Sequence, residues 1–169
     1  MDADDRLPLA YFISFRCYGT WLHGDERGST DRHHNVYGTP FIPSNKRWRQ
    51  HNERLLRQPP VSLDAARRTA VETAIRETCE KRRWLLMALN ARTNHVHSVV
   101  SAACKPESVL NALKANATRQ MREMKCWTSD LSPWSYGGSR RYLWTERSVE
   151  LAVDYVLHGQ GDDLPDFDV

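Results

Sequence analysis

Short runs of apolar and β-branched residues divide the chain into predicted strands. The first run, AYFISFRC at 10–17, is largely apolar on both faces, as in a strand inside a covered sheet. The runs RWLLMALN at 83–90 and HVHSVVSAA at 95–103 are separated by the polar turn 92–94, which predicts an antiparallel hairpin. The short run RRYLW at 140–144 predicts a fourth strand.

Longer segments with a helical repeat of apolar residues lie between these strands. The segment 62–81 has one apolar face, and we expect Ser62 to be its N-cap, with Asp64 in the first turn. Pro106 suits the first turn of a second helix, which runs to about residue 126. A third helix is expected near the C-terminus, where Thr145 would cap the segment 146–158.

The order of these elements is strand, helix, strand, strand, helix, strand and an extra helix. This order predicts an α+β fold, the ferredoxin-like βαββαβ sandwich, in which an antiparallel sheet carries two helices on one face. The other face would be open to a ligand or partner. We expect a single domain over 1–169, with an irregular loop at 18–60 and a loosely held acidic tail at 161–169.

Composition narrows the function classes. The 24 Lys and Arg exceed the 21 Asp and Glu only slightly, but residues 32–126 carry a net charge of +11 between acidic ends. A basic middle favours a polyanion partner, with nucleic acid first, although a solvated charged surface would give the same pattern. No run approaches the ~20 apolar residues of a membrane helix, and no signal peptide is evident, so we expect a cytoplasmic, nucleoid-associated protein without a membrane partner.

The four cysteines lack a CxxC pair, which argues against a zinc ribbon or a thioredoxin-type site. We expect them to be reduced and mostly buried as small apolar residues.

Basic residues in two regions are candidates for DNA contacts. The loop at 18–60 mixes cations with aromatic residues that could stack on bases, whereas its aromatic residues could equally pin the loop to the core. The helix at 106–126 carries further cations beside its apolar stripe. The candidate DNA-binding residues are Arg16, Lys46, Arg47, Arg49, Lys114, Arg119, Arg122 and Lys125.

Two histidines on the predicted strand 95–103 form a candidate metal site. His95 and His97 are two residues apart, so both imidazoles project from one face of the strand. Two imidazoles at this spacing can hold one divalent cation, although a structural pair of histidines is also common.

A tyrosine on the last helix is a candidate nucleophile. Tyr155 lies about 60° beyond the packed stripe of the helix at ~100° per residue, so its ring could be buried while its hydroxyl is presented. Ordinary amphipathic packing explains the same position. Because a tyrosine hydroxyl has a reference pKa of about 10, it needs an activated electrophile. A metal on the histidine pair could activate a phosphodiester, which would then be cut and rejoined by transesterification.

The motifs resemble a known family in their order and separation. These are TNHVH at 93–97, LWT at 143–145, AVDYV at 152–156 and the early phrase FRCYGTWLHG at 15–24. Over residues 10–160 the chain resembles the single-tyrosine transposases of the HUH endonuclease superfamily, especially the REP-associated and related insertion-sequence transposases.

The resemblance implies single-stranded or hairpin DNA as substrate and Mg²⁺ or Mn²⁺ as cofactor. It implies His95 and His97 as metal ligands and Tyr155 as the nucleophile that forms a 5′-phosphotyrosine. The family often places a third ligand one helical turn after the tyrosine, where this chain has Gly159. Gln160 is the preferred replacement and His158 the second. Relatives are monomers or homodimers.

Two alternative functions remain open at this stage. One is a non-catalytic, domesticated DNA-binding protein that recognises chromosomal repeats. The other is an unrelated metal-dependent phosphoesterase that uses the histidine pair with water as the nucleophile.

Overall fold

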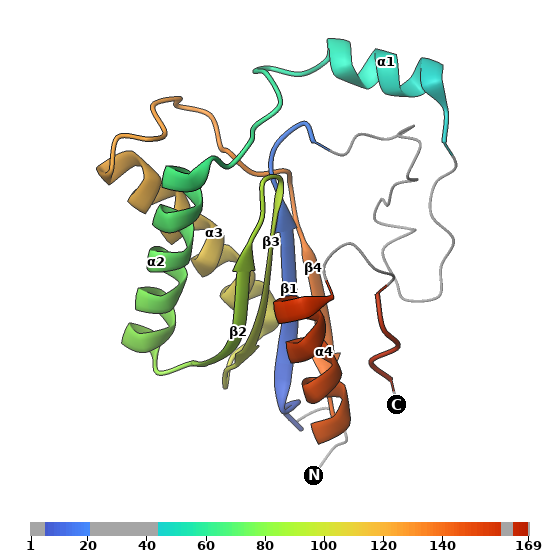
Figure 1. Ribbon diagram of the computed structural model, residues 1–169, viewed down its shortest axis with the longest axis vertical. Coiled ribbons are helices and arrows are strands. Elements are labelled where there is room, and N and C mark those ends of the chain that lie inside the picture. Colours follow the sequence, from blue (N-terminus) through green and yellow to red (C-terminus); the bar gives the residue numbers. More distant parts are fainter. Residues whose placement is uncertain (1–5, 21–43, 160–163, 169) are drawn as a thin grey trace.

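The computed structural model describes residues 6–20, 44–159 and 164–168, which form an antiparallel sheet between helices (Figure 1). The strands are β1 (Ala10–Arg16), β2 (Leu85–Ala91), β3 (His95–Ser101) and β4 (Ser139–Leu143). The helices are α1 (Lys46–Arg54), α2 (Ala65–Arg82), α3 (Pro106–Glu123) and α4 (Glu146–His158). The sheet order is β2-β3-β1-β4, and every neighbouring pair is antiparallel. These findings confirm the ferredoxin-like fold with an additional C-terminal helix.

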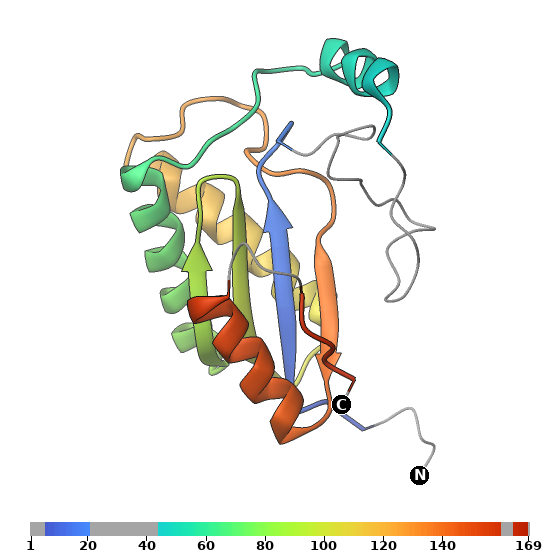
Figure 2. The same cartoon turned by 45° about the vertical axis from the view of Figure 1, so that its right-hand side comes forward.

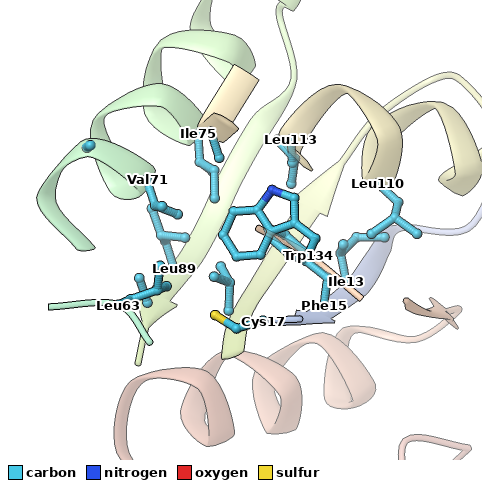
Figure 3. Packing of buried hydrophobic residues seen from close by; sticks show 14 of the residues in the cluster. Ile13, Phe15, Cys17, Leu63, Val71, Ile75, Leu89, Leu110, Leu113 and Trp134 are labelled. Carbon is cyan, nitrogen blue, oxygen red and sulfur yellow. The ribbon is translucent and has the colours of Figure 1, made fainter. Parts of the chain in front are cut away.

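Helices α2 and α3 cover one face of the sheet, and α4 crosses the other face (Figures 1 and 2). The layer beneath α2 and α3 contains the larger apolar core, with the Trp134 indole near its centre (Figure 3). Alternate residues of β1 explain this division, because Tyr11, Ile13 and Phe15 enter the larger core while Phe12 packs in the cluster under α4. The strand alternation therefore separates a dry core from a second, more polar face.

Helix α2 begins two residues later than predicted. Asp64, not Ser62, is its N-cap, and the Asp64 carboxylate accepts a hydrogen bond of 2.9 Å from Arg67 N. The reason is Leu63, whose side chain is fully buried and whose backbone N–H donates to Thr93 O. The chain is therefore held against the hairpin through Leu63 and turns into the helix only afterwards.

The expectation of an irregular stretch at 18–60 is wrong for its end, where α1 lies. Asn45 caps this helix by accepting a hydrogen bond from Trp48 N, and none of its residues is buried. Since α1 packs no face into a core, its sequence has no apolar repeat from which a helix could be predicted. Residues 21–43 of the same stretch lie outside the described residues.

The acidic tail is not loosely held where it is described. Phe167 is buried, and its ring lies 5.2 Å from that of Phe12 and 4.6 Å from the guanidinium carbon of Arg141. An aromatic residue in the tail thus finds apolar surface that α4 leaves uncovered.

Two further expectations concern the cysteines and the membrane. Cys17 and Cys79 are buried, while Cys104 and Cys126 are half-buried, and all four are free thiols. Within the described ranges, no helix has both the length and the apolar character needed to cross a bilayer.

Candidate active site

His95 and His97 lie side by side on the α4 face of the sheet. The register of β1 and β3 places Arg16 opposite His95 and Ser14 opposite His97. Val96 between them is fully buried in the opposite layer, so both imidazoles must project toward α4. The two ring centroids are 4.7 Å apart. The structure therefore confirms that the two histidines share one face.

Each imidazole is oriented by an oxygen at its Nδ1 atom. His95 Nδ1 lies 2.7 Å from Asn94 Oδ1, and His97 Nδ1 lies 2.5 Å from Ser14 Oγ. Because an amide oxygen only accepts, the Asn94 contact requires the proton on His95 Nδ1 and leaves the Nε2 lone pair available. Ser14 Oγ can accept in the same way from His97. This is the arrangement in which paired imidazoles bind a metal ion.

The protonation of His97 fits the same role. Burial, followed by the charges of His95 and the two arginines Arg16 and Arg92, lowers the pKa of His97 from 6.5 to about 3. The imidazole is therefore neutral near pH 7, and a neutral imidazole is the form that binds metal.

Tyr155 reaches the histidine pair from α4. The helix is fixed at its start by a capping box between Thr145 and Ser148, and it buries Ala152 and Val156 against the sheet. The Tyr155 ring is half-buried, with its centroid 5.7 Å from that of His97. The proposed nucleophile and a proposed metal ligand, which are 58 positions apart in the sequence, are thus neighbours.

Asn90 joins α4 to the sheet at the same place. It pairs with His97 in the register of β2 and β3, and its Nδ2 atom donates a hydrogen bond of 3.0 Å to Val156 O. Val156 directly follows Tyr155, so this bond holds the turn that carries the tyrosine.

Phe12 forms the apolar floor of the site. Its ring stacks on His97 with centroids 5.4 Å apart, and the Tyr155 ring meets it edge-on at 6.0 Å. Aromatic contacts of this kind exclude water and fix ring orientation. The hydroxyl and the imidazoles are therefore held on a rigid apolar base.

The two proposals for a third metal ligand have different outcomes. Gln160 lies outside the described residues. His158 is exposed, with its Nδ1 atom 3.1 Å from Asp154 Oδ1. Among the residues that the structure describes, no group of three His, Cys, Asp or Glu side chains could hold a metal ion. Within the described residues, His158 therefore does not join the histidine pair in a metal-binding group.

The candidate DNA-binding cations fall on different sides of the molecule. Arg16 lies on the site face beside His95, and Lys46, Arg47 and Arg49 belong to α1. The remaining four lie on or just after α3, across the sheet from the histidines: Lys114, Arg119, Arg122 and Lys125.

Several α3 cations are bound within the protein. Lys114 Nζ donates hydrogen bonds of 2.8 Å to both Ser135 O and Gly137 O, and burial lowers the pKa of this ammonium. Arg119 pairs with Glu123, and Arg122 donates to backbone carbonyls of the following loop. Lys114 thereby holds the 127–139 loop in place.

Sequence reasoning missed Ser14, Asn90 and Phe12 as parts of the site. The signals were a serine on an otherwise apolar strand and an asparagine near the end of an apolar run. Neither pattern identifies the hydrogen-bond partner of the residue, because that partner is determined by strand register and by the position at which α4 packs on the sheet.

Comparisons with known proteins give the family and the fold. A family model described as "Transposase IS200 like" matches residues 59–147, more than half of the chain. A candidate transposase from Deinococcus radiodurans superposes with a TM-score of 0.51 at 12% identity, covering 96% of this chain and 98% of that one, so the two share a fold. A REP-associated tyrosine transposase bound to a REP hairpin gives a TM-score of 0.47 at 12% identity, covering 92% of this chain and 70% of that one. No curated protein matches.

Proposed function

Because the chain belongs to the IS200-like transposase family, we propose that it cuts and rejoins single-stranded DNA, at hairpin or repeat elements, with Tyr155 as nucleophile. The observation that carries this proposal is the packing of Tyr155 against His97, with ring centroids 5.7 Å apart on one face of the sheet. A nucleophile beside a pair of imidazoles that can hold a divalent cation is the set of groups that a phosphodiester transesterase requires.

The proposed reaction exchanges one ester bond for another. Tyr155 Oη attacks the phosphorus, a new O–P bond forms, and the bond from phosphorus to the DNA 3′-oxygen breaks. The phenolic proton is lost and the departing oxygen gains one, so the products are a 5′-phosphotyrosine and a free 3′-hydroxyl. Because the ester energy is kept, a 3′-hydroxyl can reverse the step without ATP.

The residues present fit a divalent cation. His95 and His97 would hold Mg²⁺ or Mn²⁺ through Nε2, since Asn94 and Ser14 occupy the two Nδ1 atoms. Imidazole donors favour a transition-metal ion over Mg²⁺. The chemistry that such an ion supplies is polarisation of the phosphodiester and stabilisation of its developing charge.

The other residues of the site keep the reacting groups in position. Phe12 fixes the planes of both the His97 and Tyr155 rings, and Asn90 holds the end of α4. Arg16, opposite His95 in the register, is the cation best placed to bind a phosphate near the cleavage point.

A covalent trapping assay tests the proposal. The protein is incubated with a panel of labelled single-stranded hairpin oligonucleotides and Mn²⁺, and the products are separated on a denaturing gel. We expect a protein–DNA band that is absent for Tyr155→Phe and absent with EDTA. Tyr142→Phe is the matched control, because the Tyr142 ring packs edge-on against Tyr11, which belongs to the core on the opposite side of the sheet, and it should keep the band.

Two results would overturn the assignment. DNA cleavage without a covalent band identifies water as the nucleophile and removes the role of Tyr155. Binding of the panel without cleavage or a covalent band favours the non-catalytic DNA-binding protein.

A further inference from the structure

Helix α1 (Lys46–Arg54) is a feature that the transesterase site leaves unused. None of its residues is buried, and both views show it standing apart from the sheet and the other helices (Figures 1 and 2). A helix of nine residues gains little stability alone, since isolated helices below about 12 residues are marginal in water.

The charge of α1 favours a polyanionic partner. At ~100° per residue, Lys46, Arg47 and Arg54 lie within one third of the helix circumference, together with His51 at its edge. All four side chains are exposed. Their shared face is called the α1 basic face below.

The acidic residue of α1 lies at the edge of this face and pairs with a cation outside it. Glu53 lies about 20° from Lys46 at ~100° per residue, at the edge of this face, and its Oε1 atom is 3.1 Å from Arg49 Nε. Among the described residues, Arg49 and Glu53 form the ion pair of α1. Because the Glu53 carboxylate is paired with Arg49, the α1 basic face keeps a net positive charge, which suits phosphates spaced along a backbone.

Two hydrogen bonds fix the base of α1 near the candidate active site. Arg57 N donates 2.8 Å to the Tyr18 hydroxyl, and Gln58 Nε2 donates 2.8 Å to Ser132 O. Tyr18 follows the end of β1, two residues after Arg16, which pairs with His95. Helix α1 consequently projects from the end of the sheet at which the histidine pair lies (Figure 2).

We propose that the α1 basic face binds the sugar–phosphate backbone of the DNA segment that flanks the cleaved phosphodiester. The inference rests on the proposed function for the identity of the polyanion. Because its contacts are to phosphates, α1 adds affinity that does not depend on base sequence, and it holds the flanking strand while Tyr155 reacts. The helix is about 14 Å long at 1.5 Å per residue, enough to span several phosphates.

Salt-dependent binding to oligo(dT) tests this role. The triple variant Lys46→Gln, Arg47→Gln, Arg54→Gln is compared with the wild type on fluorescein-labelled dT40, at NaCl concentrations from about 50 to about 300 mM. Each phosphate contact contributes about 0.7 to the slope of log K against log salt for single strands, so the slope on dT40 should shrink by about 2. Hydrogen exchange of the α1 amides should slow when dT40 binds the wild type.

A second triple variant controls for net charge. It neutralises three exposed cations on the other side of the sheet from α4: Arg76 and Lys81 on α2, and Lys105 at the start of α3. Its slope on dT40 should equal that of the wild type. Equal losses in both triple variants, or an unchanged slope for the α1 variant, would overturn the inference.

The experiments distinguish a failure of the α1 inference from a failure of the proposed tyrosine chemistry. If the wild type forms no phosphotyrosine but the α1 variant alone loses salt-dependent binding, the chemistry fails and the α1 surface stands. If phosphotyrosine forms on short hairpins and α1 exchange is unaffected by DNA, the α1 inference fails alone.

Discussion

The side-chain amide of Asn90 donates a 3.0 Å hydrogen bond to the carbonyl of Val156, so the last turn of α4 is tied to the strand residue that pairs with His97. This bond crosses 66 positions of sequence and lies directly beside Tyr155. The distance between Tyr155 and the histidines therefore depends on one amide as well as on apolar packing.

Replacing Asn90 should affect chemistry more than stability. Asn90→Ala removes one hydrogen bond, worth about 1 kcal/mol of unfolding free energy, and should reduce covalent trapping about 10- to 100-fold at unchanged DNA binding. Asn116→Ala is the matched control, since it removes a 2.9 Å bond from an asparagine amide to Ala112 O on the far layer. Equal trapping by the two variants would show that Asn90 only stabilises the fold.

Replacing Ser14 should weaken metal binding. Ser14→Ala removes the oxygen at His97 Nδ1, and loss of such a partner typically lowers metal affinity about 10- to 100-fold. Calorimetric titration with Mn²⁺ measures the effect. Ser98→Ala is the control, because Ser98 is buried on β3 and faces the other layer. Wild-type affinity in Ser14→Ala would exclude an orienting role for this hydroxyl.

The buried His97 should make the metal-free protein less stable in acid. Its pKa is about 3 in the folded chain and near 6.5 when unfolded, so between these values the unfolded chain binds the extra proton. The free energy of unfolding should fall by up to about 1.4 kcal/mol per pH unit as pH decreases through that window. Urea unfolding in EDTA measures it. His97→Gln should flatten the dependence, whereas His158→Gln, at an exposed position, should not; identical profiles for all three proteins would contradict the assignment.

Adjacent glycines before β4 should respond differently to alanine. A Cβ on Gly138 would lie 2.7 Å from Ser14 O and 2.9 Å from Leu110 Cδ1, whereas a Cβ on Gly137 would meet nothing within 4 Å. Both glycines have positive φ, so backbone strain is common to the pair. Gly138→Ala should therefore be less stable than Gly137→Ala by about 1–3 kcal/mol, the usual range for overpacking. Equal melting temperatures of the two variants would show that β1 can move away from the added Cβ atom without a loss of stability.

The sequence was informative wherever a local rule decides the outcome. Thr145 caps a helix that spans Glu146–His158 as expected, and the alternation in HVH places both imidazoles on one face. It was uninformative where tertiary contacts decide. Leu63 delays the start of α2, and Phe167 holds the tail, because each finds an apolar surface made by distant segments. Ser14 and Asn90 acquire their roles from strand register, which no local pattern encodes.

The pairing of β1 with β3 has a consequence for how the protein tolerates mutation. Val96 and Val100 enter the core because His95 and His97 do not, so a slip of one residue would bury both imidazoles and turn the valines toward α4. A chain with this shifted register would lose both the apolar core and the arrangement of the histidine pair. It would therefore fail to fold stably, and not merely lose activity. Substitutions that preserve the strand register therefore preserve the placement of the histidine pair, which leaves the surfaces proposed to contact DNA free to vary independently.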